Sequence, residues 1–169
     1  MSDEGPTQQE LGHPGGVRDY LGHCVISSDP GKMDGMTALP TSTPHPAAVE
    51  IRRWALGSFR ELRSLRAALR EIVAGHAGEI SDRMAVVATE LATNALRHGL
   101  PPTVVRLMQS GDRLIIDVAD HHLTAAPQLD EGRPLGAGGL GLQLARTFAA
   151  DVGWYASDTT KHVWASFPR

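Results

Sequence analysis

The sequence predicts a domain of the α+β class, in which helices cover one face of a mixed, mostly antiparallel sheet. Two observations support this prediction. Residues 103–120 and residues 152–167 each read as two β-forming stretches joined by a tight turn, the pattern of a β-hairpin. Residues 60–75 and 81–98 repeat apolar side chains at helical spacing, which is typical of helices that bury one face against a sheet.

The composition limits the classes of protein to consider. The length of 169 residues suits one domain, and 41% hydrophobic with 21% charged residues excludes a fully disordered chain. The formal net charge of -3 gives no positive field, so we expect no direct nucleic-acid partner. The longest apolar run, residues 84–88, is far shorter than the roughly 18 residues that span a bilayer, so we expect no membrane partner.

Cysteine usage and the amino terminus indicate the compartment. The single cysteine, Cys24, excludes a disulfide framework and a cysteine-based zinc site, and it fits a reducing compartment. The first ten residues carry acids where a secretory signal needs basic residues. We therefore expect a cytoplasmic protein.

Residues 1–46 differ from the rest of the chain in composition. They hold seven Gly and six Pro, whereas the remaining 123 residues hold eleven Gly and five Pro. Ordering such a stretch costs much backbone entropy, and its apolar residues are too scattered to offset that cost. We expect residues 1–46 to form a disordered tail and residues 47–169 to form the folded domain.

The first folded elements follow directly. Residues 49–59 contain β-branched and aromatic side chains and predict an edge strand, and residues 60–75 predict an amphipathic helix. The apolar face of that helix consists of Leu62, Leu65, Leu69 and Ile72. A second face carries three arginines, which either form a solvated surface or bind an acidic partner: Arg63, Arg66 and Arg70.

A second helix is predicted from Ser81, as the N-cap, to a stop at Gly99. One stripe is apolar and faces the sheet, and it comprises Met84, Val87, Ala88, Leu91 and Ala95. Another stripe is polar and carries Glu90, Asn94 and His98, spaced four residues apart.

The second half of the chain begins with the hairpin whose turn is Ser110-Gly111-Asp112. Residues 121–138 then read as an irregular loop, long enough to act as a mobile lid. A helix follows from residue 140 to residue 150, and the second hairpin ends the chain.

Three polar or glycine-rich features can carry chemistry. The first is the pair Glu90 and Asn94, one helical turn apart: an Asn oxygen can hold Mg²⁺ at a triphosphate, and a Glu can orient or deprotonate a hydroxyl. The alternative is that both are polar residues on a solvated helix face. Asp120 ends a strand and can accept a hydrogen bond from an exocyclic amine, although Asp is also a routine turn residue. The stretch 136–141 opens a helix, where free backbone N–H groups bind phosphate, or it is a flexible linker.

The order of these features resembles a known family. ELATNALRHG, a hairpin ending in Asp120, and then GAGGLGLQLARTF together resemble the GHKL nucleotide-binding superfamily of gyrase, heat-shock protein 90, histidine kinases and mismatch-repair ATPases. Within it, the segment from about residue 49 to residue 167 is most similar to bacterial anti-sigma-factor serine kinases. The resemblance implies a two-layer α/β sandwich that binds nucleotide between the helices and a lid.

The resemblance also implies roles for individual residues. Asn94 would coordinate Mg²⁺, Asp120 would bind the adenine amine of ATP, and Glu90 would act as the catalytic base. The second glycine box would pack against the phosphates and comprises Gly136, Gly138, Gly139, Leu140 and Gly141. The first glycine box, which begins at Asp120, departs from the family pattern, because His122 and Thr124 stand where glycines are usual. We expect these larger residues to narrow the path by which adenine reaches its pocket, and so to reduce nucleotide affinity or hydrolysis.

The leading functional hypothesis is therefore an anti-sigma-type regulator that binds Mg-ATP and phosphorylates a serine of an antagonist protein. Its partners would be a sigma factor, that antagonist, or both, and a homodimer is compatible with the sequence. The alternative is a non-catalytic, ATP-dependent protein-binding switch. A detached histidine-kinase catalytic domain ranks last, because the helical dimerisation segment and phosphoacceptor histidine of such kinases are missing from the sequence.

Overall fold

The computed structural model describes residues 36–44, 46–75, 78–124, 126–130 and 140–169. Every described residue belongs to one compact unit, the second of the chain, which spans residues 32–169. Most of the predicted tail lies outside the described residues, and so do residue 125 and residues 131–138 of the predicted lid, which spans residues 121–138.

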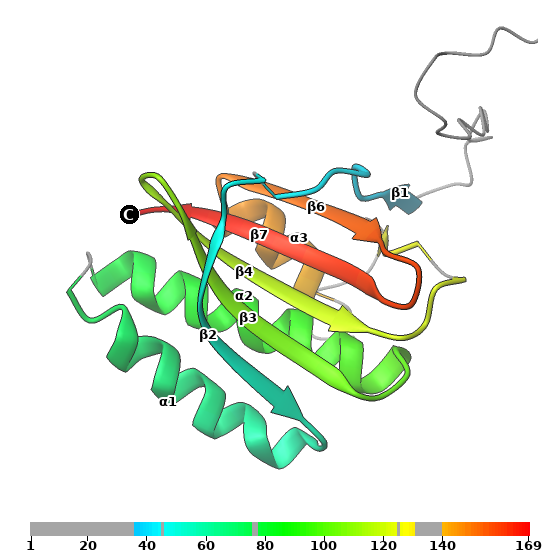
Figure 1. Cartoon of the computed structure of the whole chain (residues 1–169), viewed down its shortest axis with the longest axis horizontal. Coiled ribbons are helices and arrows are strands. Elements are labelled where there is room, and N and C mark those ends of the chain that lie inside the picture. The colour runs from blue at the N-terminus through cyan, green and yellow to red at the C-terminus, as the bar shows by residue number, and fades with distance from the viewer. Residues whose placement is uncertain (1–35, 45, 76–77, 125, 131–139) are drawn as a thin grey trace, which may run out of the picture. The chain divides into compact units, whose positions relative to one another are not determined.

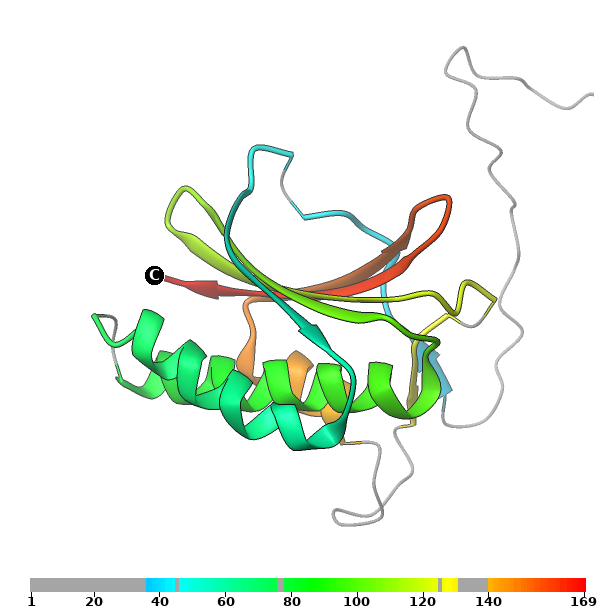
Figure 2. The same ribbon diagram turned by 60° about the horizontal axis from the view of Figure 1, so that its bottom comes forward.

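The second unit consists of two layers, a sheet and a set of helices (Figures 1 and 2). Its main sheet has five strands in the order β2-β3-β4-β7-β6, and every neighbouring pair is antiparallel. The strands are β2 (Val49–Leu56), β3 (Thr103–Ser110), β4 (Arg113–Asp120), β6 (Asp151–Ala156) and β7 (Lys161–Pro168). Both predicted hairpins are confirmed, and β2 is the edge strand that the sequence predicts.

Three α-helices cover one face of this sheet, as Figure 2 shows. They are α1 (Leu62–Ile72), α2 (Gly78–His98) and α3 (Gly141–Phe148), and a short 3-10 helix, η1 (Phe59–Glu61), leads into α1. The core lies between the layers, where fully buried side chains of α2 meet strand residues such as Leu107, Ile116 and Phe167. The predicted α+β sandwich is thereby confirmed. None of the helices in the described ranges is long and apolar enough to cross a membrane.

Helix α2 begins earlier than the sequence predicts. Its first residue is Gly78, and Ser81, the expected N-cap, lies inside the helix with 7% of its surface exposed. Ile80 packs against the core, so the apolar stripe continues one turn upstream of Met84 and keeps the chain helical there. The end at His98, before Gly99, is as predicted, and all five apolar stripe residues are buried.

Helix α1 buries a slightly different face from the predicted one. Leu65 and Leu69 are fully buried, but Ile72 is 40% exposed and Val73, just beyond the helix, is buried in its place. Val73 follows Leu69 by four residues and so continues the Leu65–Leu69 line onto α2. Of the arginines on the other face, Arg66 donates to Thr89 Oγ1 at 3.2 Å and Arg70 pairs with Asp82 at 2.9 Å, both across to α2.

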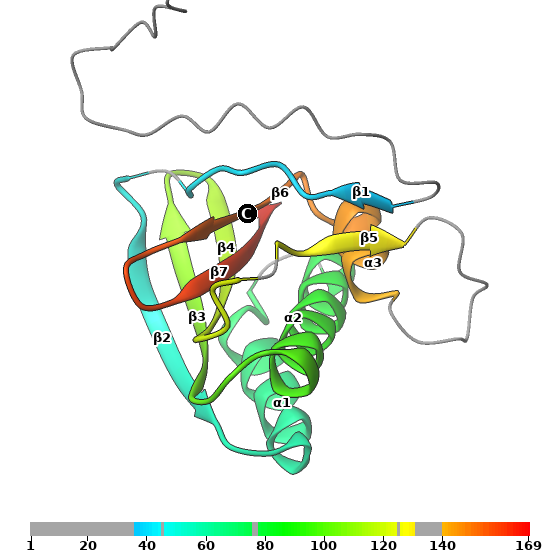
Figure 3. The same ribbon diagram turned by 90° about the vertical axis from the view of Figure 1, so that its right-hand side faces the viewer.

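Part of the stretch predicted as a tail is ordered, and so is part of the predicted loop. The strands β1 (Met36–Ala38) and β5 (Gln128–Asp130) pair antiparallel in a small second sheet beside α3 (Figure 3). Leu39 is 2% exposed, its carbonyl accepts a hydrogen bond from Trp154 Nε1 at 3.1 Å, and the carbonyl of Ser42 accepts from Trp164 Nε1 at 2.6 Å. Residues 36–44 therefore differ from the disordered tail that the composition predicts, because three strand residues and the buried Leu39 anchor them despite the Gly- and Pro-rich sequence around them.

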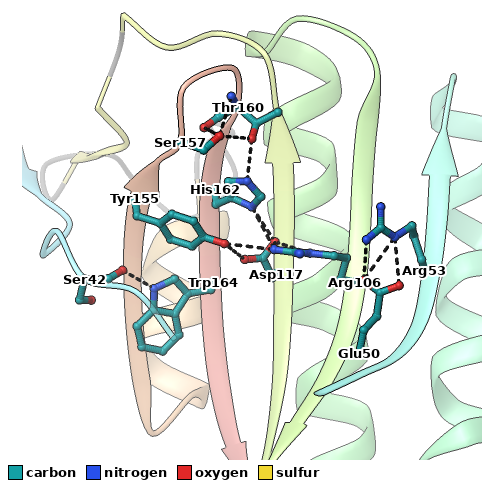
Figure 4. A network of polar contacts seen from close by, with 10 residues as sticks. All are labelled: Ser42, Glu50, Arg53, Arg106, Asp117, Tyr155, Ser157, Thr160, His162 and Trp164. Carbon is teal, nitrogen blue, oxygen red and sulfur yellow. Dashed lines mark hydrogen bonds and ion pairs between the residues drawn. The ribbon is translucent and has the colours of Figure 1, made fainter. Parts of the chain in front are cut away.

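The face of the sheet opposite the helices carries a polar network centred on Asp117 of β4 (Figure 4). Asp117 is fully buried. Its carboxylate accepts hydrogen bonds from Arg106 Nη2 at 2.9 Å, His162 Nδ1 at 2.9 Å and the Tyr155 hydroxyl at 3.1 Å. Burial, followed by the charge of Asp117, raises the pKa of Tyr155 to about 12. Burial lowers the pKa of Arg106, but the charge and hydrogen bond of Asp117 outweigh it, so that pKa lies above its ordinary value. The network holds β3, β4, β6 and β7 together on the face that the helices leave uncovered.

Candidate functional site

Helix α2 brings the first two predicted site residues to its interface with α3. Glu90 and Asn94 lie one turn apart on α2, and both are half-buried. Gly141, the first residue of α3, packs directly against them: a Cβ added there would lie 3.0 Å from Asn94 Nδ2 and 3.0 Å from Glu90 Cβ. The amino-terminal end of α3 can approach this pair so closely only because residue 141 has no side chain.

Asp120 occupies the end of β4, beside the carboxyl-terminal end of α2. Its side chain is buried, and its Oδ1 accepts a hydrogen bond from the backbone N–H of His122 at 2.7 Å. A Cβ added to Gly99 would lie 2.5 Å from Asp120 Cγ, so the carboxylate sits directly against the residue that follows α2. Asp120 is therefore fixed in a narrow space between strand and helix end.

The second oxygen of Asp120 faces a buried cation. Lys161, the first residue of β7, stands opposite Asp120 in the strand register, and its Nζ lies 3.4 Å from Asp120 Oδ2. The exposed fractions of the two side chains are 9% and 5%. This ion pair belongs to the helix-facing side of the sheet, because Lys161 lies on the same side of β7 as the core residues Ala165 and Phe167.

The residues after Asp120 are tied back to α2. The Nδ1 of His122 lies 3.0 Å from the carbonyl oxygen of His98, which can only accept, so Nδ1 carries the proton and donates. The backbone N–H of His121 donates to the carbonyl of Leu100 at 2.9 Å. The ring at position 122 is therefore engaged with the end of α2.

The predicted site residues thus gather along α2 in two groups. Glu90, Asn94 and Gly141 form one group, with Leu140 directly before α3, and Asp120 with Gly99 forms the other. Asn94 and Gly99 are five positions apart in the sequence, which corresponds to about 8 Å along a helix axis. Gly136, Gly138 and Gly139 lie outside the described residues.

The donor set of the first group suits a magnesium ion only as part of a complex. Among the described residues there is no cluster of three or more His, Cys, Asp or Glu side chains that could hold a metal by themselves. Asn94 and Glu90 offer one amide oxygen and one carboxylate, which are hard oxygen ligands of the type that Mg²⁺ accepts when phosphates complete its shell. This donor set would fit Mg²⁺ only where phosphate oxygens complete its coordination shell, and Asn94 would then be the amide ligand.

Two cavities lined by described residues lie elsewhere. One, of about 420 Å³, is lined by residues 38–40, Arg146 and residues 149–152, and the other, of about 300 Å³, lies around Trp164. Neither includes Glu90, Asn94 or Asp120. The described part of the site is closely packed around Gly99 and Gly141.

Sequence reasoning missed two residues of this site. Lys161 continues the alternation of Val163, Ala165 and Phe167 by one step, so a charge at an inward-facing position was a detectable signal. Gly99 was recognised as a helix stop, but its contact with Asp120 joins segments 21 residues apart and has no local signal.

Comparison with known families assigns the chain to a class of proteins. A family model described as the histidine kinase-like ATPase domain matches residues 57–167, well over half of the chain. The chain belongs to this family, and the resemblance to the GHKL superfamily is confirmed. An ATPase domain implies ATP binding, usually with Mg²⁺. A comparison with curated proteins found no match.

Solved structures include a similar fold. One is the crystal structure of the RsbU and RsbW domains of Rv1364c from Mycobacterium tuberculosis, which matches with a TM-score of 0.50 and 18% identity. The match covers 69% of this chain and 32% of that chain, so this chain spans about a third of the length of its neighbour. At this identity the likeness establishes the fold.

Proposed function

We propose that this protein is an ATP-binding regulator of the anti-sigma-factor type, which binds Mg-ATP and transfers the γ-phosphoryl group to a serine of an antagonist protein. The observation that carries the proposal is the packing of Gly141, at the start of α3, against Glu90 and Asn94. It brings a helix amino terminus, where phosphate binds well, next to an oxygen ligand for Mg²⁺ and a carboxylate. Family membership and the RsbW domain of the structural neighbour agree with this proposal.

Each residue of the site has a defined task in this proposal. Asn94 holds the nucleotide-bound Mg²⁺, which neutralises phosphate charge, and the glycines from Gly136 to Gly141 leave the backbone open to the phosphates. Asp120 accepts a hydrogen bond from the amine of adenine. Glu90 accepts the proton of the serine hydroxyl. The serine oxygen bonds to the γ-phosphorus while the bond from that phosphorus to the β-phosphate oxygen breaks, and ADP is the leaving group.

A second candidate function is a non-catalytic switch, in which ATP changes partner affinity without phosphoryl transfer. The observation that favours it is the engagement of His122 with the end of α2, at a position where the family usually has glycine. A side chain fixed at position 122 narrows the path by which adenine reaches Asp120. Weaker nucleotide binding or slower phosphoryl transfer would suit a switch better than a kinase.

Calorimetry tests the nucleotide site. We expect the full chain to bind ATP and ADP with an affinity that depends on Mg²⁺, and Asn94→Ala to remove most of that dependence. Asp120→Asn should weaken ATP more than inorganic triphosphate, because only ATP carries the base. Absence of ATP binding at millimolar concentration would contradict both candidate functions.

Phosphoryl transfer separates the two functions. With radiolabelled ATP and candidate antagonist proteins, Glu90→Gln should retain ATP binding and lower the labelling rate by about a hundredfold or more. Glu79→Gln, at the exposed start of the same helix, is the matched control and should leave the rate unchanged. If the wild type labels no antagonist while ATP still alters its affinity for one, the switch is the correct function.

A further inference from the structure

The Asp120–Lys161 pair is more than adenine recognition requires. A lone carboxylate is sufficient to accept a hydrogen bond from the adenine amine. Here the carboxylate is paired with the ammonium group of Lys161, whose side chain is 9% exposed, and lysine is among the residues least often buried. Taking a second charge out of water is costly, so a purely structural role is better served by an uncharged residue of similar size.

The geometry leaves hydrogen-bonding capacity on both partners. The distance of 3.4 Å between Lys161 Nζ and Asp120 Oδ2 exceeds that of a strong charged hydrogen bond, which is about 2.8 Å. An ammonium group has three donors, and each carboxylate oxygen can accept more than one hydrogen bond. The pair therefore places an acceptor, the Asp120 carboxylate that is expected to bind the base, beside a cationic donor, the Lys161 ammonium group, at the end of β4.

This arrangement matches two kinds of purine edge. Adenine offers an amine donor at position 6 beside the acceptor N1, whereas a 6-oxopurine offers an acceptor at position 6 beside the donor N1–H. A lone carboxylate repels the oxygen of a 6-oxopurine. With an ammonium group at its side, the carboxylate can take N1–H while the ammonium donates to the oxygen.

We propose that Lys161 is a specificity-determining residue of the base site, and that it lets this site bind 6-oxopurine nucleotides as well as adenine nucleotides. The proposal rests on the proposed function, since it assigns Asp120 to the base. It concerns selectivity between nucleotides and is independent of whether phosphoryl transfer follows.

The test is calorimetric titration of the full chain with Mg-ATP and Mg-ITP, because ITP differs from ATP only at this edge of the base. In the wild type we expect the two dissociation constants to agree within about tenfold. Lys161→Met removes the donor at nearly constant volume, and it should raise the ratio of the ITP constant to the ATP constant by about tenfold or more. Lys161→Arg keeps a cation and should restore most of the ITP binding.

A matched control removes an ion-paired cation elsewhere on the same sheet. Arg113→Met breaks the exposed pair with Asp151 and should leave the ratio unchanged. Thermal melts of all variants establish that they fold, and the wild-type ratio decides the question even if Lys161→Met does not fold. If the wild type binds ATP but its dissociation constant for ITP is more than tenfold higher, this inference is wrong and the proposed function stands. The same holds if Lys161→Met weakens the binding of both nucleotides equally. Binding of neither nucleotide by the wild type overturns the proposed function with it.

Discussion

Replacing Gly99 with alanine is the sharpest test of the packing around Asp120. The backbone of Gly99 is not in the left-handed region, so alanine brings no conformational strain of its own. The added Cβ would instead lie 2.5 Å from the carbonyl oxygen of Ala95 and 2.5 Å from Asp120 Cγ. Both neighbours are stiff, because one is helix backbone and the other is a buried carboxylate paired with Lys161.

The expected cost follows from that overlap. Adding a methyl group to a close-packed site usually costs about 1–3 kcal/mol. With two neighbours this close, the free energy of unfolding should fall by about 3 kcal/mol, the upper end of that range. For a domain of this size the melting temperature should fall by roughly 6–12 °C. ATP affinity should fall by about tenfold or more, because Asp120 must move to admit the methyl group.

Thermal melting and calorimetry with ATP measure the two effects. Gly78→Ala is the matched control, since it adds the same methyl group to the other end of α2, where nothing lies within 4 Å. That variant should be as stable as the wild type or slightly more stable, with unchanged ATP affinity. If Gly99→Ala behaved like Gly78→Ala in both measurements, the contact between α2 and Asp120 would be wrong.

Three further predictions concern stability. Burial raises the pKa of Tyr155 from 10.0 to about 12. The neutral phenol therefore stabilises the fold fully below pH 10, and this contribution is lost as the pH rises through about 12. Ultraviolet titration should show that Tyr155 ionises at this high pH. Asp117→Asn leaves the Arg106 cation, 21% exposed, without its counter-ion and should lower the unfolding free energy by about 2–3 kcal/mol in urea titrations. A chain that begins after residue 46 loses the buried Leu39 and should be less stable by about 2 kcal/mol than one that begins at residue 32.

Each of these predictions has its own control. Tyr155→Phe should remove the late ionisation from the titration, and an unchanged titration curve would assign it to another group. Asp151→Asn breaks an exposed ion pair and should cost at most about 1 kcal/mol; an equal cost for Asp117→Asn would refute the role of its burial. Equal melting temperatures for the two shortened chains would show that residues 36–44 contribute nothing to stability.

Several secondary elements and the order of the site motifs could be predicted from the sequence, because they depend on local patterns. Alternating apolar residues on either side of a short turn define the hairpins, and a helical period of three to four residues defines both the buried stripe of α2 and the line from Glu90 to Asn94. Helix boundaries were less predictable. Ser81 has the chemistry of an N-cap, but packing of Ile80 against the core extended the helix to Gly78, since burial outweighs a capping preference.

What only the tertiary structure decided are contacts between segments far apart in the chain. The sequence by itself places Asp120 at a strand end and glycines before α3, because turn and strand chemistry act over a few residues. The opposition of Lys161 to Asp120 depends on the register of β4 against β7, and the contacts of Gly99 and Gly141 depend on how α2 lies against a strand end and another helix. The anchoring of Leu39 likewise depends on the distant strands β5 and β6. Such contacts are fixed by the packing of the whole domain, so no local pattern in the sequence records them.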